Sequence, residues 1–137
     1  MFKLTASPIG FQKEYELLKK PEYGCVLFFL GVSRNASEDS GVKALEYSAY
    51  EDMAVAKAKE LEAKIKQKYP VGEMAIIHRM GLVPVAETSL LVIVASSHRQ
   101  QMFEALEETV DRIKKELPIW KKAIYENGET LWLKNHF

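Results

Sequence analysis

The sequence has little of several features that would narrow the class of a protein at once. It contains one cysteine, Cys25, which excludes an internal disulfide and fits a reducing compartment. Cys25 lies in the apolar run CVLFFLG, so we expect a buried, unreactive thiol rather than a nucleophile. No run approaches the roughly 18 apolar residues of a membrane span, and the N-terminal segment lacks the long apolar core of a signal peptide. A cytoplasmic protein is therefore expected.

Net charge is lacking too. Lysine and arginine together number 19, as do aspartate and glutamate, so the formal net charge at pH 7 is zero. Such a chain has no overall field that would attract nucleic acid or a membrane surface, and any anion site must be a local cluster. With 137 residues, of which 47% are hydrophobic, the chain can bury a core, and we expect residues 1–137 to form one domain.

Sequence signatures of metal and cofactor sites are missing as well. His78, His98 and His136 have no ligand spacing and no cysteine partners, which argues against a metal site. The chain has no glycine-rich phosphate loop, no nucleophile elbow and no paired-carboxylate motif. We expect neither a metal nor a bound cofactor.

The spacing of apolar residues predicts strands mixed with helices. Ser7 could cap the first helix, and Asn127-Gly128 predicts the turn of a hairpin. Gly31–Gly41 is predicted to be a mobile loop and 82–87 a turn-rich connection. Helices are expected after Ser7, over about 52–69 and over 100–116, and strands over 2–6, 25–30, 42–50, 74–80 and 90–95. This pattern fits an α+β sandwich with helices against one face of a sheet.

A histidine and an arginine stand where the last of these strands meets a helix. The apolar run ending at Ala95 is followed directly by Ser96-Ser97-His98-Arg99. A serine there could cap the helix, and its free N–H groups with the two cationic side chains would form an anion receptor. Alternatively, the polar side chains only bond nearby carbonyls. A cation at a helix N-terminus opposes the helix dipole, which a bound anion would explain, but this stretch alone leaves both interpretations open.

Two further cations follow buried strands. Arg34 comes just after the apolar run in FFLGVSRN, at a strand end, where α/β proteins often bind ligands. Taken alone, a surface arginine in a polar loop is the favoured interpretation. In IIHRMG, His78 and Arg79 form a second His-Arg pair, for which we favour a structural role because Gly81 and Pro84 suggest a tight turn.

The segment IKKELPIWKK carries the remaining candidates. Lys114 lies about 70° from the centre of the apolar stripe of its helix, and it could simply extend to solvent. Lys121 and Lys122 follow Pro118 and Trp120, a break that fixes their direction. A lysine beside a tryptophan and other cations can have a lowered pKa and act as acid, base or nucleophile, or these lysines could be solvated. Together the cations indicate an anionic small molecule, an anionic partner terminus, or both.

Five segments, in order and spacing, resemble a known family. They are FFLGVSRN, GVKALEYSAYEDMA, IIHRMG, VASSHRQQMFEALEE and IKKELPIWKKAIYENGETLW, and they span about Gly24 to Trp132. The sequence resembles the large, catalytic subunit of molybdopterin synthase. The resemblance implies an α/β hammerhead-type sandwich with an additional β-hairpin subdomain, assembled as a homodimer. It also implies a partner, a small ubiquitin-like sulfur carrier with a C-terminal Gly-Gly thiocarboxylate, giving a heterotetramer.

The same resemblance implies an activity and a site. The activity is the conversion of cyclic pyranopterin monophosphate to molybdopterin by transfer of two sulfurs from the carrier. Lys114 and Lys121 are the implied catalytic residues. The implied substrate-binding residues, from both protomers if the site is shared, are Val32, Ser33, Arg34, His98, Arg99, Lys114, Lys121, Lys122 and Ala123. Ala123 stands where the family often has Glu, and Ser33 where an apolar residue is usual, so a carboxylate role at 123 is in doubt.

Two alternative functions fit some of these residues. A non-enzymatic module that binds a phosphorylated ligand or a partner's C-terminal tail would use the same cations. Binding of single-stranded RNA through aromatic and basic residues is the other alternative, and the zero net charge argues against it.

Overall fold

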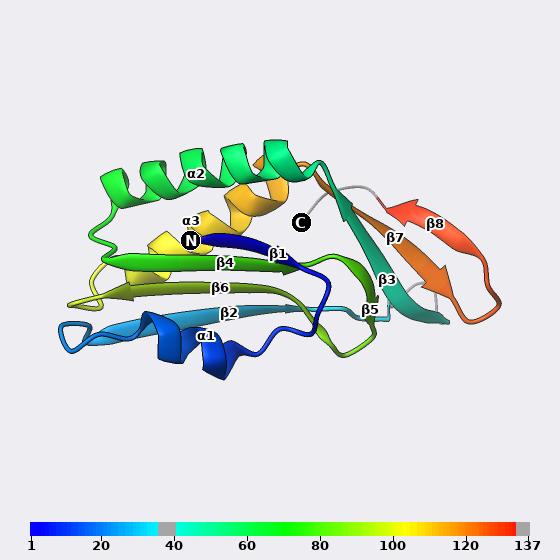
Figure 1. Ribbon diagram of the computed structural model, residues 1–137, viewed down its shortest axis with the longest axis horizontal. Helices are drawn as coiled ribbons and strands as arrows, with labels where there is room; N and C mark the ends of the chain where they lie inside the picture. Colours follow the sequence, from blue (N-terminus) through cyan, green and yellow to red (C-terminus); the bar gives the residue numbers. More distant parts are fainter. Residues whose placement is uncertain (36–40, 134–137) are drawn as a thin grey trace.

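The computed structural model describes residues 1–35 and 41–133, in which the chain forms three helices and eight strands (Figure 1). The helices are α1 (Phe11–Leu18), α2 (Glu51–Lys68) and α3 (Met102–Glu116). The strands are β1 (Phe2–Thr5), β2 (Cys25–Val32), β3 (Val42–Ala49), β4 (Glu73–Arg79), β5 (Gly81–Pro84), β6 (Thr88–Ser96), β7 (Ile119–Tyr125) and β8 (Thr130–Leu133). The expected α+β sandwich is confirmed, but helices lie against both faces of the first sheet rather than one, because α1 packs on the face opposite α2 and α3.

The first sheet has the strand order β1-β4-β6-β2, and helices cover both of its faces. Strand β1 pairs with β4 in parallel, and the other pairs are antiparallel. Alternate residues of β6 point to opposite faces, so Val92 packs against α2 and α3 while Ile93 packs on the side of α1. Because both faces are covered, the middle of the strand, the run LLVIVA over residues 90–95, is apolar throughout.

The second sheet, with the order β5-β3-β7-β8, lies at one end of the first (Figure 1). Its last two strands form the hairpin predicted from Asn127-Gly128. Gly128 has a φ of 89°, and the Asn127 Oδ1 accepts a hydrogen bond of 2.9 Å from the backbone N–H of Glu129. Strand β7 begins three residues after α3 ends, which places the second sheet beside the C-terminus of that helix.

Three details differ from the sequence-based expectations. Residues 81–84 form β5 rather than a turn-rich connection, because Gly81, with a φ of 79°, lets the chain pass directly from the first sheet to the second. Helix α1 is preceded by Gly10 without a side-chain cap, so the capping role of Ser7 is wrong. Of the predicted loop 31–41, the first two residues belong to β2, and residues 36–40 lie outside the described part of the chain.

Among the described residues, no helix is long and apolar enough to cross a membrane.

The packing of β6 makes a stability prediction. Leu91 has no exposed side chain, so Leu91→Ala should lower the free energy of unfolding by about 3 kcal/mol through lost burial and a residual cavity. Urea unfolding followed by circular dichroism measures this change. Leu17→Ala is the matched control, since Leu17 is 73% exposed on α1, and it should change stability by no more than about 0.5 kcal/mol. Equal effects of the two substitutions would contradict the assigned core.

Candidate functional site

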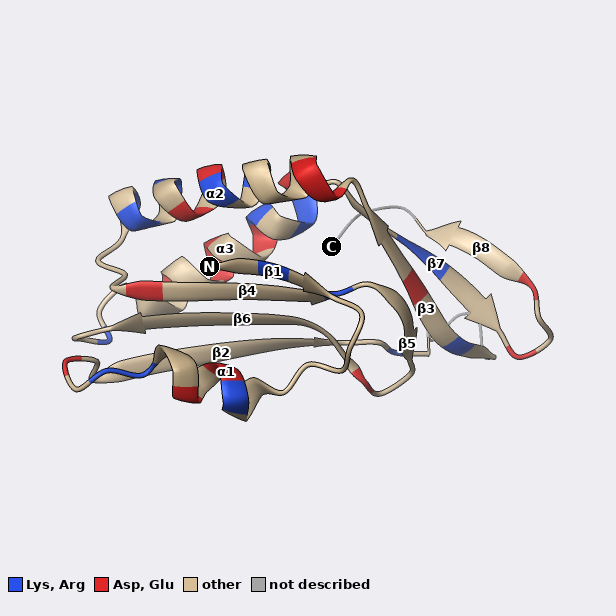
Figure 2. Cartoon of the chain, in the orientation of Figure 1, with Lys and Arg blue, Asp and Glu red and all other residues tan. Residues whose placement is uncertain are grey.

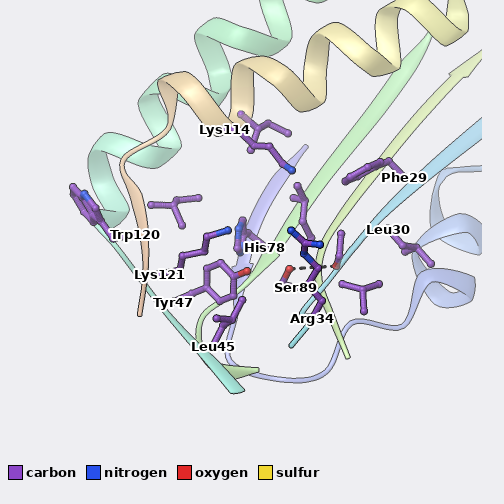
Figure 3. A pocket seen from close by; sticks show the side chains of 15 residues that line it. Phe29, Leu30, Arg34, Leu45, Tyr47, His78, Ser89, Lys114, Trp120 and Lys121 are labelled. Carbon is purple, nitrogen blue, oxygen red and sulfur yellow. Dashed lines mark hydrogen bonds between the residues drawn. The ribbon is translucent and has the colours of Figure 1, made fainter. Parts of the chain in front are cut away.

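A cavity of about 380 Å³ lies where the two sheets meet the C-terminal end of α3 (Figure 3). Its floor is apolar and includes Phe29, Leu45 and Leu90. Seven side chains with polar groups line it. They come from the end of β2, from β3, β4 and β6, from the last turn of α3 and from β7, and they are Arg34, Tyr47, His78, Ser89, Lys114, Trp120 and Lys121.

The cavity brings together three cations that are far apart in the sequence. Arg34 follows β2, Lys114 lies in the last turn of α3, and Lys121 is the third residue of β7. None of the described residues that line the cavity is Asp or Glu. The site is therefore electropositive although the chain is neutral, and it suits an anionic ligand. Val32, another predicted site residue, lies at its rim and is 48% exposed.

Lys114 is held at the cavity by both its helix and an aromatic ring. Its ammonium lies 5.7 Å from the centre of the Phe29 ring, a cation–π contact. The C-terminal end of α3 also favours a cation in its last turn. Burial lowers the pKa of Lys114, and the charge of Asp111 partly opposes that shift.

Lys121 faces the cavity because of the register of β7. It pairs with Tyr47 of β3, so both side chains lie on the same face of the second sheet. Burial lowers the pKa of Lys121, and the positive charges of Lys114 and Arg34 lower it further. Such a lysine exchanges its proton more readily than a solvated one, which suits acid–base work.

His78 and Tyr47 form a packed aromatic pair in the cavity wall. Their ring centres are 4.9 Å apart and their planes are inclined by 61°. His78 is 6% exposed, and burial, together with the charges of Lys121 and Lys114, lowers its pKa to about 4. Burial also raises the pKa of Tyr47. Both groups are therefore neutral near pH 7.

Sequence reasoning missed several residues of this cavity, among them Phe29, Tyr47 and His78. A structural role was favoured for His78, while Tyr47 and Phe29 were treated only as parts of strands. The position of Phe29 could have been predicted from the alternation of side chains along β2. This alternation directs Phe29 and Leu27 toward the side of α3. Nothing in the sequence alone indicates that Tyr47 and His78 lie together, because that contact joins the two sheets.

His98 and Arg99 do not line this cavity in their own chain. In the antiparallel pairing of β6 with β2, Ser96 lies opposite Cys25, whereas Thr88 lies opposite Val32. Arg34 therefore follows one end of the sheet, and His98 follows the other. The two ends of the paired strands lie roughly 23 Å apart, at about 3.3 Å per strand residue. Both His98 and Arg99 are exposed.

The predicted serine cap at this corner is wrong. Helix α3 begins at Met102, and the residue before it, Gln101, has a φ of 66° and no side-chain cap. The Ser96 hydroxyl instead donates a hydrogen bond of 2.7 Å to the carbonyl of Pro70. His98 and Arg99 thus lie in a turn ahead of the helix rather than in its first turn.

Three other predicted site residues point away from the cavity or into the core. Lys122 projects from the opposite face of β7, where its ammonium lies 3.5 Å from the Glu46 carboxylate and 5.3 Å from the Trp132 ring centre. Ala123 is 1% exposed and packs among core residues of the second sheet. Ser33 is 1% exposed, and its backbone N–H donates to the carbonyl of Glu87 at 2.9 Å.

Comparisons with known proteins agree with this architecture. The family model described as "MoaE protein" matches residues 4–116. The chain belongs to the MoaE family. A relative from Bos taurus named "Molybdopterin synthase catalytic subunit" is 37% identical over 98% of this chain and 71% of its own length. A relative of the same name from Bacillus subtilis is 37% identical over 93% of this chain and 82% of its own length.

Solved structures of MoaE-type proteins share the fold. The crystal structure of molybdopterin synthase from Staphylococcus aureus has a TM-score of 0.89 and 31% identity, covering 97% of this chain and 96% of that one. A complex of subunits 1 and 2 of the molybdopterin-converting factor from Helicobacter pylori has a TM-score of 0.79 at 20% identity, covering 97% of this chain and 90% of that one; this likeness shows the fold. The family suggested by the sequence is therefore confirmed, as is its role as a molybdopterin synthase catalytic subunit.

The burial of His78 predicts a pH dependence of stability. In the unfolded chain the pKa is 6.5, and in the fold it is about 4, so the unfolded state takes up a proton first as the pH falls. The free energy of unfolding should drop by about 2 kcal/mol between pH 7.5 and pH 5 from this group.

Urea unfolding at both pH values measures this loss. His78→Gln, which has no titrating ring, should remove that part of the pH dependence while the contributions of all other groups persist. An unchanged dependence in this variant would show that His78 titrates normally in the fold.

Proposed function

We propose that the chain converts cyclic pyranopterin monophosphate to molybdopterin by sulfurtransferase chemistry, using the C-terminal thiocarboxylate of a small ubiquitin-like carrier. The observation that carries the proposal is the convergence of Arg34, Lys114 and Lys121 on one cavity in a MoaE-family chain. The substrate's phosphate and the carrier's thiocarboxylate are both anions, so this cluster of cations would hold both reactants together. We treat residues 1–137 as one functional unit, because both sheets contribute to the cavity wall.

Lys114 and Lys121 are assigned to the reacting groups. The carrier's sulfur forms a bond to a carbon of the pterin side chain while a carbon–oxygen bond of that carbon breaks, and the oxygen leaves with a proton supplied through Lys121. Water then cleaves the acyl–sulfur bond, so that the carrier leaves as a carboxylate and the sulfur stays on the pterin. Lys114 neutralises the thiocarboxylate and the acyl intermediate, and Lys121 contacts the substrate and transfers protons. A second carrier repeats the step for the second sulfur. Lys122, Ala123, Ser33 and Val32 would support the site from β7 and from the end of β2.

The phosphate site is proposed to be shared between two copies of the chain. Arg34 lies at the rim of the cavity, and an arginine binds phosphate with two parallel hydrogen bonds. His98 and Arg99 are exposed at the far end of the same sheet, so they can reach a cavity only in another protomer. A two-fold dimer in which each corner meets the partner's cavity completes both sites at once.

The apolar part of the cavity suits the tail of the carrier. Leu30 and Val32 are 40% and 48% exposed at its rim, beside the buried floor. A Gly-Gly tail has no side chains, so its backbone can pass between such walls and place its terminal thiocarboxylate at Lys114. We propose that two carriers and two large subunits form a heterotetramer. Its proposed place is the cytoplasm, since the free Cys25 fits a reducing compartment.

The two alternatives find less support. Relatives at 33–40% identity carry the name of a catalytic subunit, which disfavours a module that only binds. For RNA binding, a continuous basic face would be needed, and Figure 2 shows Lys, Arg, Asp and Glu interspersed along α2.

Replacing Lys114 tests the assigned chemistry. Lys114→Ala should lower the rate of molybdopterin formation by at least about 100-fold, because the negative charge developing on the acyl intermediate loses its counter-charge. Turnover is measured with purified protein, thiocarboxylated carrier and the cyclic pterin. Lys115→Ala is the control, since Lys115 is the exposed neighbour on the same turn, and it should keep the parent rate and the same thermal midpoint. Parent activity in Lys114→Ala would refute the role.

Mixing two inactive variants tests the shared site. If His98 acts on the partner's cavity, a dimer of one Lys114→Ala chain and one His98→Ala chain contains one fully intact site. Random exchange should then restore about a quarter of the parent activity. Each variant alone should stay inactive at the same total concentration. Absence of any recovery after verified subunit exchange would place both residues in one protomer's site, against the proposal.

A further inference from the structure

His78 is a buried polar group of the cavity for which the proposed reaction has no role so far. It lies at the end of β4, between Leu4 of β1 and Leu90 of β6, and it is 6% exposed. Its ring lines the cavity together with both lysines. A packing role alone could be filled by an apolar side chain, so a buried imidazole at this place needs a reason.

The backbone determines which nitrogen of the ring carries the proton. The Nδ1 atom lies 3.0 Å from the carbonyl oxygen of Arg79, and a carbonyl only accepts hydrogen bonds. The Nδ1 must therefore be the donor. In the neutral ring the Nε2 then carries no hydrogen and presents a lone pair, in a ring that lines the cavity.

Three cations share the cavity with this ring. Lys121 comes from β7, Lys114 from α3 and Arg34 from the end of β2, while Tyr47 packs on the ring from β3. Figure 3 shows the Lys121 side chain reaching toward the imidazole, and the positive charge of Lys121 acts on His78 more strongly than that of Lys114. A neutral acceptor at this place can bind an ammonium. Unlike a carboxylate, it adds no negative charge that would compete with the anionic substrate for that ammonium.

We propose that His78 is a positioning residue, whose Nε2 accepts a hydrogen bond from the Lys121 ammonium and directs it at the reacting end of the cavity. This inference rests on the proposed function, in which Lys121 contacts the substrate and transfers protons. A carboxylate in the same place would bind Lys121 as an ion pair and would repel the phosphate and the thiocarboxylate. The imidazole orients the lysine and leaves its charge available.

Two substitutions distinguish the roles of the two ring nitrogens. In His78→Gln the side-chain amide reaches the place of Nε2 and can accept from Lys121, whereas in His78→Asn the amide reaches only the place of Nδ1. Glutamine should keep kcat within about threefold of the parent, and asparagine should lower kcat about tenfold or more with little change in KM for the pterin. Equal losses of kcat in the two variants would overturn the proposal.

Nuclear magnetic resonance tests the same contact without turnover, so its outcome is independent of the proposed reaction. With ¹⁵N-labelled histidine, Nδ1 of His78 should show a protonated shift and Nε2 an unprotonated one between pH 6 and 8. The pKa of Lys121, followed on its labelled side chain, should be lower in His78→Asn than in the parent and in His78→Gln, because a lost acceptor destabilises the ammonium. A protonated Nε2, or a Lys121 pKa that is equal in all three proteins, would overturn the proposal even if the enzyme proves active.

Discussion

The arrangement of this protein depends on holding Arg34, Lys114 and Lys121 at one partly buried cavity whose described lining has no carboxylate. Like charges at such a place repel each other, and burial adds a desolvation cost. Burial lowers the pKa of both lysines, and the positive charges of Lys114 and Arg34 lower the pKa of Lys121 further. An anion in the cavity would relieve it, so the same repulsion that costs stability in the free protein becomes affinity for a phosphate or a thiocarboxylate.

The rest of the fold supplies the rigidity that this repulsion requires. Strand β6 is buried on both faces, and it fixes the position of β2 on one side and β4 on the other. Helix α3 packs across β6 and β2, so its last turn stands over Phe29. The chain enters the second sheet at Gly81 and again at the start of β7. These two connections place the second sheet against the last turn of α3. Lys114 and Lys121 are therefore carried by different elements, and neither can move away without breaking a helix contact or a sheet pairing, while Arg34 follows β2 at the edge of the cavity.

Position 123 is consistent with this picture. Ala123 is on the same face of β7 as Lys121, two residues along, but it is 1% exposed and packs beside Leu45. A glutamate there would be a carboxylate close to Lys121. With alanine at this position, the neutral His78 is an acceptor of this part of the cavity wall. The lysine of this chain is thus surrounded by neutral acceptors and other cations among the described lining residues.

The sequence by itself determined the helices and strands with strong apolar periodicity, the Asn127-Gly128 hairpin, the family, and the candidate roles of Arg34, Lys114 and Lys121. These features follow from local patterns or from segments matched in order. Local patterns can be recognised in a sequence without knowledge of distant contacts. Tertiary structure decided the rest: that His98 and Arg99 lie at the far end of the sheet, that Lys122 faces away, that Ser96 bonds Pro70 instead of capping a helix, and that Tyr47 and His78 meet. Each of these depends on strand register or on the meeting of the two sheets. A one-residue change of register reverses the face of every side chain, so only the paired strands can decide it.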